Sequence, residues 1–413
     1  MKMNSLFLDA LRCALKNQQV TWQQEITTAQ WEQLFELSRT QRVLPMIYNA
    51  VFSCPSARRA DKAVFAAVRK QVFQQVLIQV QKDQEFEQLY RFLEQEELRP
   101  AIVKGMVCRT LYPNPEYRGS GDEDLLIGPL DFDRCHRAML DFGMTTTASE
   151  ENLTADYEIP YRKPGTALYV ELHRYLFPPE SEAYGNLNSY FLPDKTKTIP
   201  FSVNDFQVTT LNETSHLLYL ICHAYKHFIH SGVGIRQLCD IALFARTYSH
   251  RIRWDYVYEK CLAFHGTVFV AALFRIAKEH LDISIASDDL PQLWKACDID
   301  ANDLLQDMLS GGVYGQADES RLHSSNITLT AVANAGEKAS LLQGMKESLF
   351  PSREQMVRKY PYLKEKPALL PLAWAQRICT FGANYAKSGR NVSQVVSIGK
   401  ARVALLEKYQ MID

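Results

Sequence analysis

Two aspartates stand two positions apart, directly after a glycine-rich turn, in the stretch RGSGDEDLLI at 118–127. Side chains two apart on a β-strand point to the same face, so Asp122 and Asp124 can converge on one cation while Glu123 points away. Mg²⁺ is bound in proteins by a few carboxylates together with substrate phosphates. The pattern therefore predicts a divalent-cation site that acts on phosphates.

A third carboxylate is expected from the strand predicted at 167–173. Alternate positions of this segment are apolar, and the positions between them hold Tyr169, Glu171 and His173. Such alternation is typical of a half-buried strand whose second face borders a site. We therefore expect Glu171 to join the two aspartates as a metal ligand and catalytic residue. The plain alternative is three unrelated surface acids, because a D-x-D pair is common.

Two glycine-bearing segments flank the acidic pair and offer contacts to phosphate. Lys104-Gly105 lies at the expected start of a short helix, where backbone N–H groups and a lysine both favour anions. In the second segment, Gly119-Ser120-Gly121 allows close backbone approach, and Arg118 supplies a bidentate donor. Both segments are predicted to bind a nucleotide, and the sequence does not decide which one holds the triphosphate.

A histidine-rich helix is predicted after the N-cap residue Asn212. Its histidines recur at intervals that place them on one face: His216, His223, His227 and His230. One interpretation directs this face, with His223 and Lys226, toward a bound nucleotide, and another is simple packing. A zinc site is the weakest interpretation, because no local carboxylate or thiol accompanies the histidines.

Three other charged residues are given structural interpretations. Arg109 is expected on a helix surface, and Glu123 is assigned to structure or solvent. Asp240 either pairs with Arg236 at i,i+4 or faces the cleft.

The same residues carry a resemblance to a known family. The pattern KGxxxRxLYPxPxxR at 104–118, followed by DxDLL at 122–126, resembles the uncharacterised nucleotidyltransferase family of the polymerase-β-like superfamily. The resemblance extends from about Leu89 to about Tyr360 and is strongest at 98–127.

The resemblance implies a glycine-containing turn, a D-x-[DE] pair and a third carboxylate on a neighbouring strand, here Asp122, Asp124 and Glu171. It also implies transfer of a nucleotidyl group from an NTP with release of pyrophosphate, with Mg²⁺ or alternatively Mn²⁺ as the cofactor. One departure is that Met106 follows Lys104-Gly105, where the superfamily has a Gly-Gly or Gly-Ser turn.

Composition limits the function classes. The chain has 413 residues, is 46% hydrophobic and carries a net charge of −1, which fits a globular protein and argues against a whole-surface nucleic-acid binder. We therefore expect a small-molecule or protein acceptor.

Nine scattered cysteines without a CxxC pair favour a reducing, cytoplasmic location over a disulfide framework. Neither a signal peptide nor a membrane span is expected.

The predicted fold class is α+β, with a central mixed β-sheet nucleotidyltransferase core between N-terminal helices and a C-terminal helical bundle. The division is a helical segment at 1–95, an α/β core at 96–210 and a helical region at 211–413. Strands are expected at 101–103, from 122, and at 144–147, 157–162, 167–173 and 198–201. The stretch 310–328 is expected to be a loop, and helices are expected at 329–347, 368–387 and 393–409.

Two rival functions belong to other classes. A catalytically inactive nucleotide- or partner-binding module could keep the same fold, and the three carboxylates argue against it. A histidine-based metallohydrolase on the helix at 216–230 lacks an acidic ligand in the sequence nearby.

Overall fold

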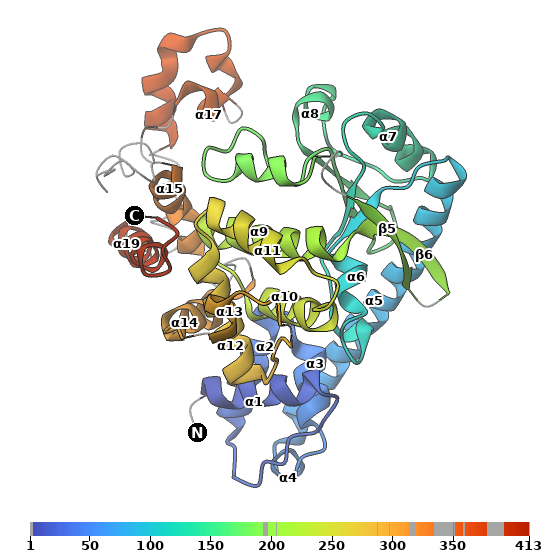
Figure 1. Cartoon of the computed structure of the whole chain (residues 1–413), viewed down its shortest axis with the longest axis vertical. Coiled ribbons are helices and arrows are strands. Elements are labelled where there is room, and N and C mark those ends of the chain that lie inside the picture. Colours follow the sequence, from blue (N-terminus) through green and yellow to red (C-terminus); the bar gives the residue numbers. More distant parts are fainter. Residues whose placement is uncertain are drawn as a thin grey trace.

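The structure of the chain is a computed structural model (Figure 1). The described residues are 3–192, 197–203, 205–286, 288–296, 298–313, 319–333, 350, 352–357, 360–377 and 392–412.

The N-terminal part of the chain is helical, as predicted. Its helices are α1 (Met3–Leu15), α2 (Thr28–Thr40), α3 (Leu44–Val51), α4 (Pro55–Arg58) and α5 (Lys62–Gln95). Thr27 caps α2 in a capping box with Gln30, and Asp61 accepts a hydrogen bond from the Ala63 N–H at the start of α5. α5 is 34 residues long and runs from the N-terminal helices to the sheet (Figure 1).

One mixed six-stranded sheet forms the centre of the core, in the order β3-β4-β2-β1-β6-β5. The strands are β1 (Ala101–Val103), β2 (Glu123–Leu126), β3 (Glu158–Arg162), β4 (Tyr169–His173), β5 (Thr198–Val203) and β6 (Phe206–Leu211). The pairs β2–β4 and β1–β6 are parallel, and the other neighbouring pairs are antiparallel. Because β2 and β1 lie in the middle, the acidic pair and the Lys-Gly turn reach the same part of the sheet.

Short helices connect the strands. They are α6 (Gly105–Arg109), η1 (Pro115–Tyr117), α7 (Phe132–Asp141), α8 (Glu150–Ala155) and η2 (Gly185–Tyr190). Gly143 follows α7 with a positive φ of 92°, as is common for the glycine that ends a helix.

The C-terminal part of the chain is helical. Its helices are α9 (Glu213–His230), α10 (Ile235–Thr247), α11 (Trp254–Ala263), α12 (Thr267–Leu281), α13 (Gln292–Ala296), α14 (Asn302–Gly311), α15 (Glu319–Ala333), α17 (Arg353–Val357), η4 (Pro361–Leu363), η5 (Pro367–Leu369) and α19 (Val392–Lys408). Asn212 caps α9 as predicted, through a hydrogen bond that the Ser215 N–H donates to its side chain. The predicted helices at 329–347 and 368–387 lie partly outside the described residues.

Three local predictions are wrong. The strand expected at 144–147 is a single bridge between Thr145 and Arg162. β6 is absent from the predicted strands, although its buried Phe206 and Val208 alternate with more exposed residues. Within the stretch expected to be a loop, α15 begins at Glu319.

The helix α15 forms because tertiary contacts outweigh the weak helix propensity of its serine and threonine residues. Arg321 pairs with Asp307 of α14, and the Thr328 hydroxyl donates a hydrogen bond to the Ile229 carbonyl of α9. α15 also packs along α19.

One apolar cluster joins the N-terminal helices, the sheet and the C-terminal helices. It includes Phe7 of α1, Ile102 of β1 and Leu273 of α12, all fully buried. The Gln41 side chain adds polar contacts between the two helical parts, because it donates to the Met308 carbonyl and accepts from the Ile235 N–H. Among the described residues, no helix is both long enough and apolar enough to cross a bilayer.

Candidate functional site

The pairing of three strands brings the predicted site residues together. β2 and β4 run parallel with Asp124 directly opposite Glu171. On the other side of β2, Val103 of β1 lies opposite Asp124, and Lys104 follows as the first residue after β1. The site therefore forms where β1 ends and β2 and β4 lie side by side.

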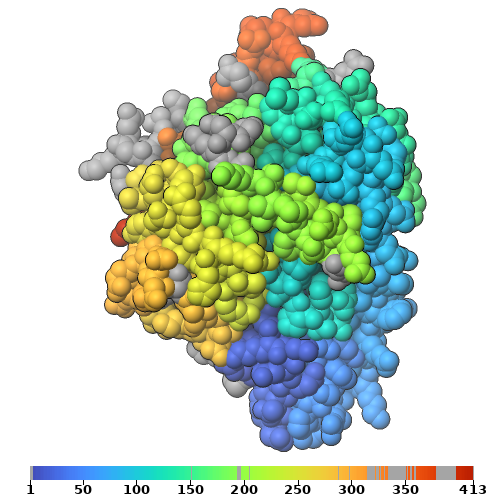
Figure 2. Space-filling view, turned by 45° about the vertical axis from the view of Figure 1, so that its right-hand side comes forward, coloured from blue at the N-terminus to red at the C-terminus, as the bar shows by residue number. Residues whose placement is uncertain are grey.

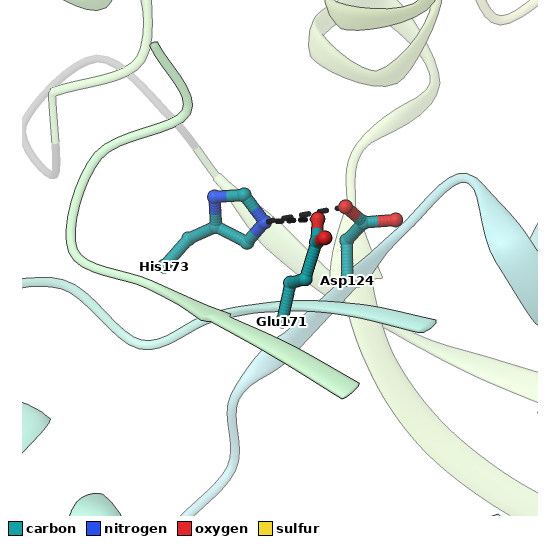
Figure 3. A group of neighbouring side chains, drawn as sticks. All are labelled: Asp124, Glu171 and His173. Atoms are coloured by element: carbon teal, nitrogen blue, oxygen red, sulfur yellow. Dashed lines mark hydrogen bonds and ion pairs between the residues drawn. The ribbon is translucent and has the colours of Figure 1, made fainter. Parts of the chain in front are cut away.

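Asp124, Glu171 and His173 form a compact cluster (Figure 3). His173 Nε2 lies 3.2 Å from Asp124 Oδ1 and 3.9 Å from Glu171 Oε2. One potential ligand atom from each residue lies within 4.8 Å of the other two. In the part of the chain that the structure describes, this is the one group of three or more such residues that could hold a metal ion.

His173 was not among the predicted site residues. Its position two residues after Glu171 on the same strand placed it on the same face, and that spacing was the available signal. The neighbouring strand β3 adds another missed carboxylate, since Glu158 Oε2 lies 3.5 Å from His173 Nδ1.

The cluster carries excess negative charge. Burial, followed by the charges of Asp124 and Asp122, raises the pKa of Glu171 to about 8. Burial opposes protonation of His173, but its hydrogen bond to Asp124 and the charge of Glu158 raise its pKa above the usual value. A positive charge at the cluster would therefore be stabilised.

Lys104 connects the cluster to α9. Its Nζ lies 3.1 Å from Asp124 Oδ2 and 3.1 Å from His223 Nε2. Its backbone has φ 60° and ψ −120°, a conformation that residues other than glycine seldom adopt. The Lys104 N–H donates a hydrogen bond to His216 Nε2, whose ring contacts the Thr210 hydroxyl through Nδ1. His216 thus holds the strained turn in place.

Asp122 lies close to the cluster but outside it. It precedes β2 and borders a narrow cavity of about 20 Å³ together with Lys104, His223 and Arg236. Burial opposes ionisation, but the charges of Lys104 and Arg236 lower the pKa of Asp122 below its usual value. The cavity has room for about one water molecule, so a triphosphate requires some of these side chains to move.

Glu123 points to the other side of the sheet, as the strand periodicity predicts. It is buried, and its carboxylate accepts hydrogen bonds from the Arg109 guanidinium at 2.7 Å and from the Met106 N–H at 2.9 Å. Arg109 also pairs with Asp83 of α5 at 2.7 Å. The expectation that Arg109 lies on a helix surface is wrong, because two carboxylates balance its charge in the interior.

Arg118 is also engaged within the protein. Its Nε and Nη2 donate to the two oxygens of Asp240 at 2.7 and 2.6 Å, and both side chains are buried. The Tyr112 hydroxyl donates a third hydrogen bond to Asp240 at 2.7 Å. Asp240 therefore forms its ion pair with Arg118. Of the two alternatives that the sequence left open, the i,i+4 ion pair with Arg236 is not found among the described residues, and Asp240 does border the cavity.

The loop Gly119-Ser120-Gly121 is held from two sides. Lys82 Nζ donates to the Ser120 and Gly121 carbonyls at 2.8 and 3.1 Å. Arg236 Nη1 donates to the Gly119 carbonyl at 2.5 Å. Arg236 is only 3% exposed, and its Nε has no hydrogen-bond partner among the described residues. Arg236 is thus a cavity-lining cation that was predicted only as a partner of Asp240.

The histidines of α9 do not act as one group. His216 lies under the Lys104 turn, and His223 and His227 are neighbours with 3.1 Å between their Nε2 atoms. Burial keeps the pKa of His223 and of His227 well below the usual value, so both rings are neutral at pH 7. Lys226, whose pKa burial lowers, lies 3.4 Å from the Tyr157 hydroxyl next to β3. This face of α9 therefore lies over the sheet, beside the cluster.

The cluster has the chemistry of a divalent-cation site. Two carboxylates and an imidazole form a donor set suited to Mn²⁺, and the carboxylates suit Mg²⁺. Asp124 Oδ2 is buried and accepts no hydrogen bond from the described residues, although Lys104 Nζ forms an ion pair with it. A buried oxygen without such a hydrogen bond, Asp124 Oδ2, and a carboxyl group with a raised pKa, Glu171, are both features of a site that can bind a cation.

Comparison with known proteins gives one match. A family model described as an uncharacterised nucleotidyltransferase matches residues 27–282, which extend from the N-cap of α2 to the end of α12 and include the whole candidate site. No curated protein and no solved structure gives a significant match.

Proposed function

The chain belongs to the uncharacterised nucleotidyltransferase family, and we propose that it transfers a nucleotidyl group from an NTP to an acceptor and releases pyrophosphate. The observation that carries this proposal is the register of β2 and β4, which places Asp124 opposite Glu171. Nucleotidyl transfer requires negative charge to be neutralised where pyrophosphate leaves, and paired carboxylates recruit the cations that do this.

We assign the catalytic cation to Asp124, Glu171 and His173, with Asp122 at the edge facing the substrate. Mg²⁺ or Mn²⁺ bound there would activate the attacking oxygen and neutralise charge on the leaving pyrophosphate. Before a cation binds, His173 orients the Asp124 carboxylate through the 3.2 Å contact from its Nε2 atom. The parallel pairing of β2 and β4 keeps Asp124 and Glu171 in place, so these two carboxylates need little rearrangement when a cation binds.

For the phosphates, we propose contacts from Lys104, His223 and Lys226, as the sequence indicates, together with Arg236. Lys104 is placed between the cluster and α9, and a phosphate oxygen could replace Asp124 as its partner once a cation takes that carboxylate. Gly105, Arg118 and the loop Gly119-Ser120-Gly121 complete the proposed nucleotide site. Their hydrogen bonds within the protein favour a role in shaping it.

The acceptor that we propose is a small molecule or a protein side chain. Arg109 and Arg118, two cations in this part of the fold, are balanced by buried carboxylates. Little uncompensated positive charge is therefore left for a polyanionic acceptor. The cysteines within the described residues are free thiols, which supports our proposal of a reducing, cytoplasmic location.

The test measures binding of a non-hydrolysable NTP by calorimetry, with and without Mg²⁺ or Mn²⁺, so that it does not depend on the unknown acceptor. Metal-dependent binding is expected for the wild type, and Asp124→Asn should abolish the metal dependence because the site needs the carboxylate charge. Asp133→Asn, at an exposed carboxylate of α7, is the matched control and should bind as the wild type does.

A second measurement separates an enzyme from an inactive binding module. Pyrophosphate release should be detectable with wild-type protein and candidate acceptors and absent with Asp124→Asn. Nucleotide binding that needs no metal and is unchanged in Asp124→Asn would refute the assigned site. Metal-dependent binding without turnover on any acceptor would favour the inactive module.

A further inference from the structure

The middle of α5 has a broad apolar side, much of which is exposed. In the stretch VFQQVLIQV at 72–80, one residue, Gln79, is buried, and Val72 and Val76 are half-buried. The large apolar side chains that remain exposed are Phe73 (69%), Leu77 (46%), Ile78 (46%) and Val80 (38%). The apolar side of a helix is normally covered. Single exposed apolar residues are common, but a contiguous group of them marks a contact surface.

Three of these residues form a stripe. Phe73, Leu77 and Val80 are spaced i, i+4, i+7 and therefore line one side of the helix. Beside the stripe lies a hollow of about 650 Å³ between α3, α4 and α5, which is bordered by aromatic rings that include Phe52 and Phe65. In Figure 2 the light-blue residues of α5 form the right-hand edge of the lower part of the molecule.

Charge is distributed unevenly along the same helix. From Lys62 to Lys82 the helix carries basic residues and no acid. Four acids and one base, Arg91, follow in the C-terminal part, whose net charge is therefore negative: Asp83, Glu85, Glu87 and Glu94. Each acid forms an ion pair within the chain, and the pairs of Glu87 with Arg91 and of Glu94 with Arg99 lie at the surface. A partner that lies along the whole helix is best matched if it is acidic at one end and basic at the other, with an apolar middle.

We propose that this face of α5 is the interface of a homodimer, in which the α5 helices of two copies pack antiparallel about a two-fold axis near Val76 and Leu77. A two-fold axis places each residue of one copy against a symmetry-related position of the other. Phe73 then meets the Val80 position of the second copy, and Lys70 comes within a turn of the Glu87 position. The apolar middle covers itself, and the basic part of each copy faces a part with net negative charge, although Lys62 comes near the Arg91 position of the other copy.

An antiparallel second copy fits the helix better than an anionic membrane does. A membrane would attract the basic, apolar stretch 62–82 but would repel the acidic part from Asp83 onward. A helix of 34 residues is about 50 Å long, which is enough for an extended helix–helix interface. The inference rests on α5 alone and is independent of the proposed catalytic site.

Sedimentation equilibrium of the full chain tests the proposal, and a concentration-dependent dimer is expected. Leu77→Glu should weaken the dimer at least tenfold, about 1.4 kcal/mol, because it places a charge in the apolar middle. Leu262→Glu is the matched control, since Leu262 is 60% exposed on α11, and it should leave the dimer unchanged. Both residues are exposed, so both variants should keep the wild-type fold by circular dichroism.

A charge exchange tests the antiparallel direction. Lys70→Glu and Glu87→Lys should each weaken the dimer, and the two changes in one chain should restore it. The ion pair that Glu87 forms with Arg91 of the same helix is exposed and contributes little to the stability of the chain. A wild-type chain that stays monomeric at about 100 μM would overturn the proposal, since that corresponds to less than about 6 kcal/mol of association. A monomer that instead floats with phosphatidylserine vesicles, and loses this binding in Leu77→Glu, would assign the surface to membranes and equally overturn it.

Discussion

Lys104 is held at the centre of the candidate site because both its side chain and its backbone N–H interact with neighbouring residues. Its ammonium group lies between Asp124 and His223, and its backbone N–H is held by His216. The strained backbone of Lys104 places a cation next to the carboxylate cluster, and strain of this kind is usually kept where function needs it. In the proposed reaction this lysine moves from a carboxylate to a phosphate.

Glu171 should make metal binding depend on pH. Its pKa is about 8 without a cation, so below that pH a metal ion must displace a proton. His173 also has a raised pKa and must lose its proton to bind the ion. Affinity for Mn²⁺ should therefore rise by at least about tenfold per pH unit between about pH 6 and 7.5 and level off above about pH 8, with at least roughly one proton released per ion at pH 7. Calorimetry in buffers of different ionisation enthalpy measures both quantities.

Glu171→Gln provides the comparison, and it should bind the ion more weakly with a flatter pH dependence. In the metal-free protein, the raised pKa means that the folded chain binds this proton more tightly than the unfolded chain. The free energy of unfolding should therefore fall as pH rises from about 4.5 toward about 8, and Glu171→Gln should remove that part of the decline. Affinity that stays constant from pH 6 to pH 8 would contradict the assignment.

Arg118 and Arg236 should respond differently to truncation. Arg118→Ala leaves Asp240 buried without its bidentate partner and should lower the free energy of unfolding by about 3–5 kcal/mol. Arg236→Ala removes one hydrogen bond to a loop carbonyl and should mainly weaken NTP binding, by about 1–3 kcal/mol. Thermal or urea unfolding and nucleotide calorimetry measure the two effects.

A double replacement, Arg118→Met with Asp240→Leu, is the control for the buried pair. It should recover part of the lost stability, because no charge is left without a partner. If Arg118→Ala were as stable as the wild type but bound nucleotide weakly, Arg118 would return to the role of a phosphate ligand.

At the scale of elements, the turn from β1 into α6 depends on Gly105. Its φ is +33°, and a Cβ there would lie 2.1 Å from Glu123 Oε2. That carboxylate accepts the Met106 N–H at the start of α6. The sequence suggested that an anionic ligand binds next to Gly105. The Glu123 carboxylate occupies that position instead, and its hydrogen bond from Met106 links β2 to α6.

Gly105→Ala should therefore lower the free energy of unfolding by at least about 2 kcal/mol, because the Glu123 carboxylate must move and lose its hydrogen bonds. Gly128→Ala is the matched control. Gly128 also has a positive φ, of 79°, but has no atom within 4 Å of the added Cβ, so that variant reports the backbone cost alone. Equal losses of stability in the two variants would show that the contact with Glu123 is unimportant.

Local periodicity predicted most elements of the core, including β1 at its observed bounds and the start of α9 after Asn212. It failed where long-range contacts decide the outcome. β6 is stabilised by parallel pairing with β1, more than a hundred residues earlier in the chain. The helix α15 is held by α14, α9 and α19, none of which its own sequence can specify.

At the scale of the whole molecule, the sheet lies between two helical groups that also contact each other. α1 packs against α12, and Gln41 joins the end of α2 to α14 and to the start of α10. The N-terminal helices thus help to support α10, which carries Arg236 and Asp240. The predicted division at 95 and 210 follows changes in element type and stays a prediction as a set of domains.

The balanced charge of the molecule predicts weak binding of nucleic acid. The net charge is −1, and Arg109 and Arg118 are balanced internally, so little positive charge remains beyond the groups proposed to hold the NTP, and a run of nucleic-acid phosphates would find few cations to bind. Filter binding at about 50 mM salt should show only weak, non-selective retention of RNA or DNA. The basic part of α5 is the internal control, and Lys70→Glu should reduce what retention remains. Tight binding with a steep salt dependence, or labelled nucleotide at an RNA 3′ end, would refute this.

The sequence by itself determined that Asp122 and Asp124 share a face opposite Glu123, that Glu171 lies on the site face of its strand, and that the family is a nucleotidyltransferase family. These conclusions depend on spacings of two residues and on a continuous motif. Tertiary structure alone decided which charges remain available for a ligand. Arg118 meets Asp240 from 122 positions away, and His173 reaches Asp124 across 49. Ion pairs form between whatever groups the fold brings within a few ångströms, and no local pattern records that distance.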